Sequence, residues 1–336
     1  MINPLGLSRA IGLLSGGLDS ILAFRILREQ GVDVECLAFT TPFFGATSAH
    51  AAAARLGVTL EVRDITAVHL AMLRAPRYGY GSGLNPCIDC HALMLRLAGD
   101  LMTERGLDFI FTGEVLGQRP MSQSRGSLQL VARLSGYEGF ILRPLSARLL
   151  EETRPEREGK VERERLLALS GRGRKPQIEL ARRLGITDYP EPAGGCLLTD
   201  PIFAGRLKAV LAEFGDLLPR LIELLKAGRQ FRPAPGIRLV VGRHQRDNER
   251  LAELFRPEEG DWLLLCGENF PGPSALVYGA GEAAAKDLLE LAAVVCLSYS
   301  DAPAAALGRV EVTGRGQAFG LEVRSRPRAD FQAIMV

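Results

Sequence analysis

The sequence predicts a doubly wound α/β domain with a parallel sheet, followed by a second, smaller α+β domain. Three observations predict this architecture. Short apolar runs alternate with helical patterns over residues 10–114, and a glycine-rich turn joins the first run to the first helix. A Pro- and Gly-rich segment then precedes a region of closely spaced strand patterns. We therefore place the two domains at residues 1–200 and 201–336.

Hydrophobic periodicity defines the elements of the first domain. In chain order, they are strand 10–14, helix 19–31, strand 32–40, helix 49–57, strand 59–66, helix 90–105 and strand 108–114. Residues 151–177 are charged and rich in Gly and Pro, which favours a mobile or substrate-ordered insertion. In the second domain, a helical stretch over residues 201–228 leads through the loop FRPAPG into strands at GIRLVVG, DWLLLC and SALVYG.

Composition narrows the class of protein. The 336 residues carry a net charge of +2, and no run of about 18 apolar residues offers a membrane span. The amino terminus lacks the pattern of a signal peptide, so we expect a cytoplasmic protein without a membrane partner. Six cysteines are too few for a disulfide scaffold, so clustered cysteines indicate metal binding or catalysis.

The hexapeptide SGGLDS at residues 15–20 lies between a predicted buried strand and a helix. Backbone N–H groups and the helix dipole make such a turn an anion site, and glycine lets phosphate approach closely. The segment lacks the Lys of a Walker-type loop. It resembles the SGGxDS signature of the PP-loop ATP pyrophosphatases, which have an adenine nucleotide alpha hydrolase-like fold and cleave ATP between the α and β phosphates.

This resemblance implies roles for individual residues. Ser15, Gly16, Gly17 and Ser20 would hold pyrophosphate, and Asp19 would help hold Mg²⁺. The family also implies that Phe39 and Thr40, at the tip of the second strand, lie beside the adenosine, although Phe39 is equally suited to the core. ATP and Mg²⁺ are the expected cofactors.

Three cysteines form the second signal. Cys87 and Cys90 lie just before a predicted helix, close enough to share one metal or one substrate, and Cys196 follows the flexible segment Pro192-Ala193-Gly194-Gly195. The combination resembles the tRNA 2-thiouridylases and, more loosely, the 4-thiouridine synthetases. For Cys36, Cys266 and Cys296 we expect inert core positions.

Two mechanisms fit the three cysteines. In the first, which the extra thiol of Cys87 favours, all three thiolates bind a 4Fe-4S cluster with one open iron that carries sulfide. In the second, which the cluster-free thiouridylases imply, Cys90 is the nucleophile and Cys196 carries a persulfide. A structural zinc site completed by His91 is a third option.

Other segments carry weaker signals. The segment TGEVLGQ resembles the TGExxGQ segment of 4-thiouridine synthetases, which implies that Gly113 approaches the nucleotide and that Gln118 borders the cleft. A basic group before Cys196 is suited to tRNA phosphate or to solvent; its members are Arg172, Arg174, Lys175, Arg182 and Arg183. The second domain resembles the NFACT-R module of RNA-handling proteins and offers Arg243, His244, Arg246 and Arg250 around a Gly turn.

Together these patterns predict an ATP-dependent tRNA sulfurtransferase that adenylates a uridine carbonyl oxygen, releases pyrophosphate and replaces the oxygen with sulfur. The expected partners are tRNA and a sulfur donor, either free sulfide or a persulfide carrier. The oligomeric state stays open, with a homodimer among the options. Two alternatives remain: a PP-loop ligase or sulfur-inserting enzyme acting on a small molecule, and a non-catalytic RNA-binding protein.

Overall fold

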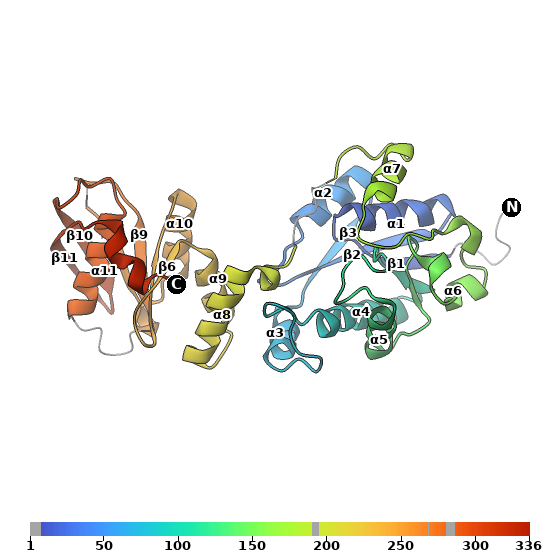
Figure 1. Ribbon diagram of the computed structural model, residues 1–336, viewed down its shortest axis with the longest axis horizontal. Coiled ribbons are helices and arrows are strands. Elements are labelled where there is room, and N and C mark those ends of the chain that lie inside the picture. The colour runs from blue at the N-terminus through green and yellow to red at the C-terminus, as the bar shows by residue number, and fades with distance from the viewer. Residues whose placement is uncertain (1–7, 190–194, 268, 280–285) are drawn as a thin grey trace. The chain divides into compact units, whose positions relative to one another are not determined.

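The computed structural model describes residues 8–189, 195–267, 269–279 and 286–336 (Figure 1). The chain divides into two compact units, Met1–Pro201 and Ile202–Val336. Within the described residues, none of the helices combines the length and the apolar character that crossing a bilayer requires.

The first unit is built on a five-stranded parallel sheet of order β3-β2-β1-β4-β5. Its strands are β1 (Arg9–Leu13), β2 (Asp33–Thr40), β3 (Leu60–Asp64), β4 (Phe109–Phe111) and β5 (Ile141–Leu142). The chain runs outward from β1 to β3 and then returns to the other side of β1 with β4. The carboxyl ends of β1 and β4 therefore lie next to each other at the point where the strand order reverses, which is where doubly wound proteins bind ligands.

Helices cover both faces of this sheet (Figure 1). Residues of the helices α1 (Leu18–Glu29), α2 (Thr47–Leu56) and α7 (Lys175–Arg183) pack with Ala10 and Phe111 in one apolar core. The helices α4 (Cys87–Glu104) and α5 (Arg125–Ser135) pack with Ile11 and Ile110 in the other. The side helix α3 (Thr66–Arg74) contacts α4, and the short helix α6 spans Arg154–Arg157. The predicted doubly wound α/β fold is confirmed.

Two details differ from the sequence prediction. Helix α4 begins at Cys87, three residues earlier than expected, so Cys87 and Cys90 both lie in its first turn. The charged stretch 151–177, expected as a mobile insertion, packs onto the first core through Val161 and Leu166, which are 4% and 1% exposed. Its apolar residues are too few to give a strong periodic signal, yet they suffice to anchor it.

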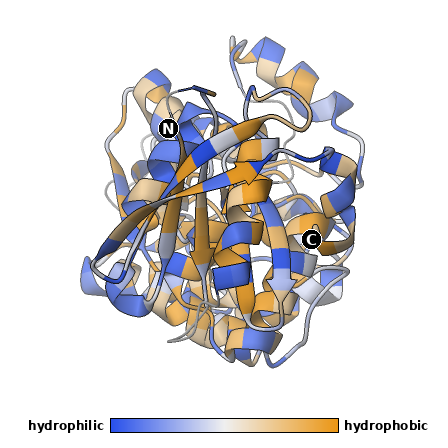
Figure 2. Ribbon diagram, turned by 90° about the vertical axis from the view of Figure 1, so that its left-hand side faces the viewer, coloured by the Kyte–Doolittle hydropathy of each residue, from blue (hydrophilic) through white to orange (hydrophobic). Residues whose placement is uncertain are grey.

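The second unit contains a six-stranded sheet of order β11-β10-β8-β9-β7-β6, and all its pairs are antiparallel. Apolar residues line its strands and the helices packed on them (Figure 2). The strands are β6 (Arg229–Ala234), β7 (Ile237–Val241), β8 (Trp262–Cys266), β9 (Ser274–Tyr278), β10 (Leu307–Gly314) and β11 (Gln317–Arg324). The helices are α8 (Pro201–Phe214), α9 (Pro219–Lys226), α10 (Gln245–Leu254) and α11 (Lys286–Ser298).

The expected second α+β domain is therefore confirmed, with one correction. The segment FRPA, predicted as part of a loop, belongs to strand β6. Pro233 is tolerated there because β6 is an edge strand, and the pairing with β7 is irregular between Phe231 and Ala234. The described residues also form short 3₁₀ helices: η1 (Ala147–Leu149), η2 (Arg163–Arg165), η3 (Leu197–Thr199), η4 (Pro257–Glu259) and η5 (Arg328–Ile334).

Candidate functional site

The glycine-rich turn joins β1 to α1 at the carboxyl edge of the first sheet. Gly16 has a φ of +80°, and a Cβ atom there would lie 2.2 Å from the carbonyl group of Ser48, so only glycine fits. The Ser20 hydroxyl donates to the Gly17 carbonyl at 2.8 Å, and the Gly17 N–H donates to Ser15 Oγ at 3.3 Å. Gly17 caps α1 without a side chain, which leaves the first turn of the helix open to an anion.

The segment after β4 packs directly against this turn. A Cβ atom on Gly113 would lie 2.5 Å from the backbone nitrogen of Ser20, so glycine is required for the close approach. Gln118 Nε2 donates to Asp19 Oδ2 at 3.0 Å. The structure thus brings together Gly113, Gln118 and residues 15–20, which the sequence separates by about a hundred positions.

Asp19 is a partly satisfied carboxylate at this edge. Its Oδ1 atom is buried and has no hydrogen-bond partner within the described part of the chain. Burial raises the pKa of Asp19, while the hydrogen bond from Gln118 and the charges of Arg174 and Arg119 oppose the rise. A buried carboxylate oxygen that lacks a partner fits the ligand chemistry of Mg²⁺.

The three predicted cysteines lie near one another. The Leu197 N–H donates to the Phe43 carbonyl at 3.1 Å, which fixes the Cys196 segment beside the end of β2. Burial raises the pKa of Cys90 far above its usual range, and the sulfur atoms of Cys196 and Cys87 add to the effect. Burial likewise raises the pKa of Cys196, and the charge of Arg119 opposes it. Pro192, Ala193 and Gly194 of the approach loop lie outside the described residues.

Arg119 connects the two halves of the site, since its charge acts on both Asp19 and Cys196. Arg174 approaches Asp19 from the residue before α7, and its Nε atom is buried without a hydrogen-bond partner among the residues described. The other members of the predicted basic group are exposed: Arg172, Lys175, Arg182 and Arg183. Only Arg174 of that group thus reaches the phosphate-loop edge.

Sequence analysis did not predict two residues that contact the thiols, His69 and Asn85. His69 is fully buried, and its Nε2 atom lies 3.5 Å from Cys90 Sγ. The rings of Phe43 and Phe44 lie 5.6 and 5.8 Å from the imidazole, and burial lowers the pKa of His69 to about 4, so the ring is neutral at pH 7. Asn85 Nδ2 donates to Cys87 Sγ at 3.1 Å. His69 lies in an ordinary amphipathic helix and carries no motif that could have indicated it.

The zinc alternative finds no support in the geometry. Within residues 8–189 and the other described ranges, no three His, Cys, Asp or Glu side chains are grouped so that they could hold one metal ion. His91 Nδ1 instead contacts Glu114 Oε1 at 3.0 Å. Glu114 is buried and also accepts from Arg143 Nε at 2.9 Å; although burial opposes the change, Arg143 and then His91 lower the pKa of Glu114 to about 2.

The two residues expected beside adenosine have different environments. Phe39 is 6% exposed and packs in the core beneath α4, so the core alternative describes its surroundings. Thr40 is half-buried at the carboxyl end of β2. Of the two, Thr40 is the one placed at the sheet edge that carries the glycine-rich turn.

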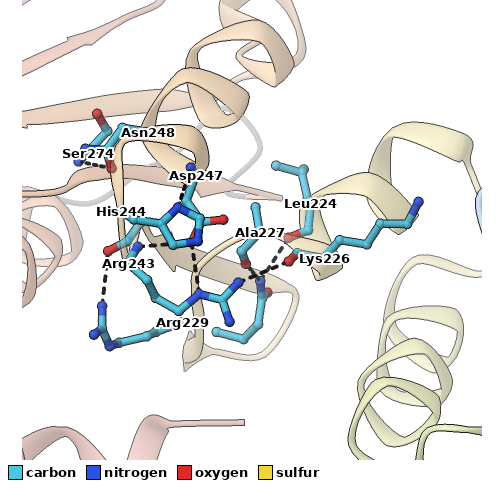
Figure 3. A network of polar contacts seen from close by, with 11 residues as sticks. Leu224, Lys226, Ala227, Arg229, Arg243, His244, Asp247, Asn248 and Ser274 are labelled. Atoms are coloured by element: carbon cyan, nitrogen blue, oxygen red, sulfur yellow. Dashed lines mark hydrogen bonds and ion pairs between the residues drawn. The ribbon is translucent and has the colours of Figure 1, made fainter. Parts of the chain in front are cut away.

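In the second domain, the basic turn at residues 242–248 is largely satisfied by its own groups (Figure 3). Arg243 donates to Asp247 Oδ2 through its backbone N–H at 3.1 Å and through Nε at 2.9 Å. His244 Nδ1 accepts from the Asp247 N–H and caps α10. Arg250 pairs with Glu223 and Glu253. Of the four predicted contact residues, Arg246 is exposed and forms no ion pair with the described residues.

A different basic group lies nearby. The guanidinium carbons of Arg229 and Arg328 lie 4.8 and 5.1 Å from the centre of the Tyr299 ring. Arg229 donates to the Gly242 carbonyl, and Arg328 donates to the Ser298 carbonyl; neither pairs with a carboxylate in the described residues. We call Arg229, Tyr299 and Arg328 the Tyr299 cluster. Sequence reasoning missed it because its members lie far apart along the chain.

Comparison with known proteins finds a family model that resembles part of each unit. Residues 7–149 match the family model described as thiamine biosynthesis protein (ThiI), and residues 228–333 match the model described as NFACT protein RNA binding domain. A tRNA-specific 2-thiouridylase MnmA of Pelobacter propionicus is 28% identical over 224 residues, which cover 61% of this chain and 59% of that protein. A probable tRNA sulfurtransferase of Acholeplasma laidlawii is 27% identical over 42% of this chain and 35% of its own length.

The chain therefore spans less than two thirds of the length of these curated relatives. Among solved structures, a 4-thiouridine synthetase in complex with RNA and ATP is 19% identical, covers 53% of this chain and 52% of its own, and has a TM-score of 0.33. The carboxy-terminal part of a fibronectin/fibrinogen-binding protein from Streptococcus suis is 12% identical, covers 40% of this chain and 67% of its own, and has a TM-score of 0.27.

Proposed function

We propose that this chain, whose residues 7–149 resemble a thiamine biosynthesis protein (ThiI) and whose residues 228–333 resemble an NFACT protein RNA binding domain, is an ATP-dependent tRNA sulfurtransferase. The uridine carbonyl oxygen attacks the α phosphate of ATP, pyrophosphate leaves, and sulfur then displaces AMP. The single observation that supports the proposal is electrostatic: the charge of Arg119 acts on both Asp19 of the phosphate loop and Cys196, and Cys196 and Cys87 act on Cys90.

The phosphate loop supplies position and charge. The first turn of α1 and the hydroxyls of Ser15 and Ser20 are suited to hold pyrophosphate as it leaves. Asp19, oriented by Gln118, offers its free Oδ1 to the Mg²⁺ that neutralises the phosphates. Arg119 and Arg174 add positive charge where negative charge develops on the α phosphate.

The three cysteines are proposed to bind a 4Fe-4S cluster. Burial and the neighbouring cysteines raise the pKa of Cys90 and of Cys196, so these half-buried thiols are suited to a group that takes up thiolates and supplies positive iron, as a 4Fe-4S cluster does. Cys87, Cys90 and Cys196 would hold it. A cluster binds each thiolate to a different iron, unlike a single zinc ion. When bound, it would supply an open iron for sulfide.

Without a cluster, Cys90 and Cys196 would act as nucleophile and persulfide carrier. Anaerobic purification with an absorption spectrum and an iron count separates the two routes. The cluster route predicts about four iron atoms per chain, lost in Cys87→Ala, Cys90→Ala and Cys196→Ala. An iron-free protein that still thiolates tRNA leaves the persulfide route.

The NFACT-R-type domain is proposed to hold the tRNA. The Tyr299 cluster supports this, because arginines held over an aromatic ring without a carboxylate partner are suited to phosphates and stacked bases.

Pyrophosphate release with and without tRNA tests the proposal. We expect release to require tRNA and to accompany thiouridine formation. Release that is independent of tRNA would favour an enzyme acting on a small molecule, and no release at all would favour a non-catalytic RNA-binding protein.

A further inference from the structure

Two cysteines of the second domain, expected to be inert core residues, lie in direct contact. Cys266 ends strand β8 and Cys296 lies in helix α11, thirty positions later. Their Sγ atoms are 3.6 Å apart. Because both thiols are free, the contact brings together two sulfur atoms that one small movement could join.

The two thiols differ in access. Cys296 is fully buried and its Sγ donates to the Pro273 carbonyl at 3.3 Å. Cys266 is only partly buried, so solvent reaches it first. The contact with the Cys296 sulfur lowers the pKa of Cys266, although burial opposes this. An accessible thiol of lowered pKa beside a buried partner is the arrangement found in oxidisable cysteine pairs.

The backbone segment next to the two cysteines requires a glycine at position 272. A Cβ atom on Gly272 would lie 2.8 Å from Cys266 Sγ and 2.4 Å from Ser300 Cβ. Only glycine therefore lets this segment pass beside the sulfur. Pro273, the next residue, supplies the carbonyl that holds the Cys296 thiol. The segment thus keeps both sulfur atoms in place.

We propose that Cys266 and Cys296 form an oxidisable thiol pair that hydrogen peroxide converts to an intramolecular disulfide. The Cys266 thiolate attacks the peroxide, the O–O bond breaks, and sulfenic acid and water form after proton transfer. The Cys296 sulfur then attacks the Cys266 sulfur, the S–O bond breaks, and a second water leaves. The two thiols give two electrons to the peroxide. The sulfur atoms need only approach from 3.6 Å to about 2.05 Å.

Peptide mapping of the full-length protein tests this site independently of tRNA thiolation, so its failure and the failure of the proposed function are distinguishable. The reduced protein is treated with one equivalent of hydrogen peroxide, free thiols are alkylated, and the peptides are analysed by mass spectrometry. We expect a Cys266–Cys296 linked peptide that forms at least about ten times faster than oxidation of Cys36. Cys36 is an internal control, because it is buried and burial raises its pKa to about 11.

Two variants separate the steps. In Cys296→Ser, Cys266 should stop as a sulfenic acid that dimedone traps. In Cys266→Ser, the buried Cys296 should stay reduced. The proposal is wrong if Cys266 and Cys296 of the unaltered protein can still be fully alkylated after peroxide has oxidised Cys36. It is also wrong if Cys266 forms a disulfide with another cysteine.

Discussion

The carboxyl edge of the first sheet and the turn at residues 242–248 of the second domain are both rich in polar side chains. At the sheet edge, Asp19 Oδ1 and Arg174 Nε are buried without hydrogen-bond partners among the described residues, and burial together with Cys196 and Cys87 raises the pKa of Cys90. In the turn, Asp247 neutralises Arg243, and His244 caps a helix. Buried polar groups normally find partners within the protein, so the unsatisfied edge is the one built for ligands.

The largest expected effect comes from the thiol that lies nearest the end of the first domain. Cys196→Ser should reduce thiouridine formation at least about 100-fold, because it removes a sulfur carrier or a cluster ligand. Pyrophosphate release should remain within about threefold, since the phosphate loop is intact. Parallel assays of both products check this. Equal loss of both products would mean that Cys196 also serves ATP activation.

The next variant uncouples activity from stability. Asp19→Asn should reduce pyrophosphate release about 100-fold, because the Mg²⁺ ligand is weakened. Its melting temperature at pH 7 should equal or exceed that of the unaltered protein. The pKa of Asp19 is raised by burial, so its carboxylate destabilises the fold as pH rises through that pKa, and Asn removes the cost. A clear drop in melting temperature would show that Asp19 is structural.

Glu114 is the satisfied counterpart of Asp19 in the same region. Its pKa lies at about 2, below the usual 4.5, so its stabilising effect is present above pH 4.5 and is lost as pH falls toward 2. Glu114→Gln should lower the free energy of unfolding at pH 7 by about 3 kcal/mol, because it leaves Arg143 buried and uncompensated.

Urea unfolding measures the Glu114 effect, with Glu311→Gln as the matched control. Glu311 pairs with Arg309 at 2.6 Å, but both side chains are exposed, so we expect no measurable change in the free energy of unfolding. Similar losses in the two variants would remove the distinction between buried and exposed pairs.

The smallest effect concerns tRNA binding. Arg229→Gln with Arg328→Gln should weaken tRNA binding about fivefold and reduce the magnitude of the salt slope by about 1 to 2, as expected for two lost phosphate contacts. Arg243→Gln should change the affinity for tRNA less than about twofold at the same salt concentration, because Asp247 already neutralises this arginine.

Binding titrations at several salt concentrations measure the tRNA effect, and Arg309→Gln is the matched control from the same domain. A larger loss of tRNA affinity for Arg243→Gln than for the double variant would indicate that the turn at residues 242–248, and not the Tyr299 cluster, contacts RNA.

Sequence patterns predicted the parts of this molecule that depend on local rules. The alternation of strands and helices and the strand-turn-helix at residues 15–20 both follow from periodicity and glycine chemistry. Strand β6 was missed because Pro233 obscured an edge strand. His69, the Tyr299 cluster and the contact between Cys266 and Cys296 were not predictable, since each joins residues that only tertiary packing brings together.

The central claim is that the PP-loop and the three thiols act together on one uridine of tRNA. The most direct measurement is a single-turnover reaction of the full-length protein with tRNA, Mg-ATP and sulfide under anaerobic conditions, with nucleoside mass spectrometry of the tRNA and quantification of pyrophosphate. We predict one thiouridine per pyrophosphate released, and neither product without ATP. Pyrophosphate that forms at the same rate without tRNA, together with unmodified tRNA, would contradict the account.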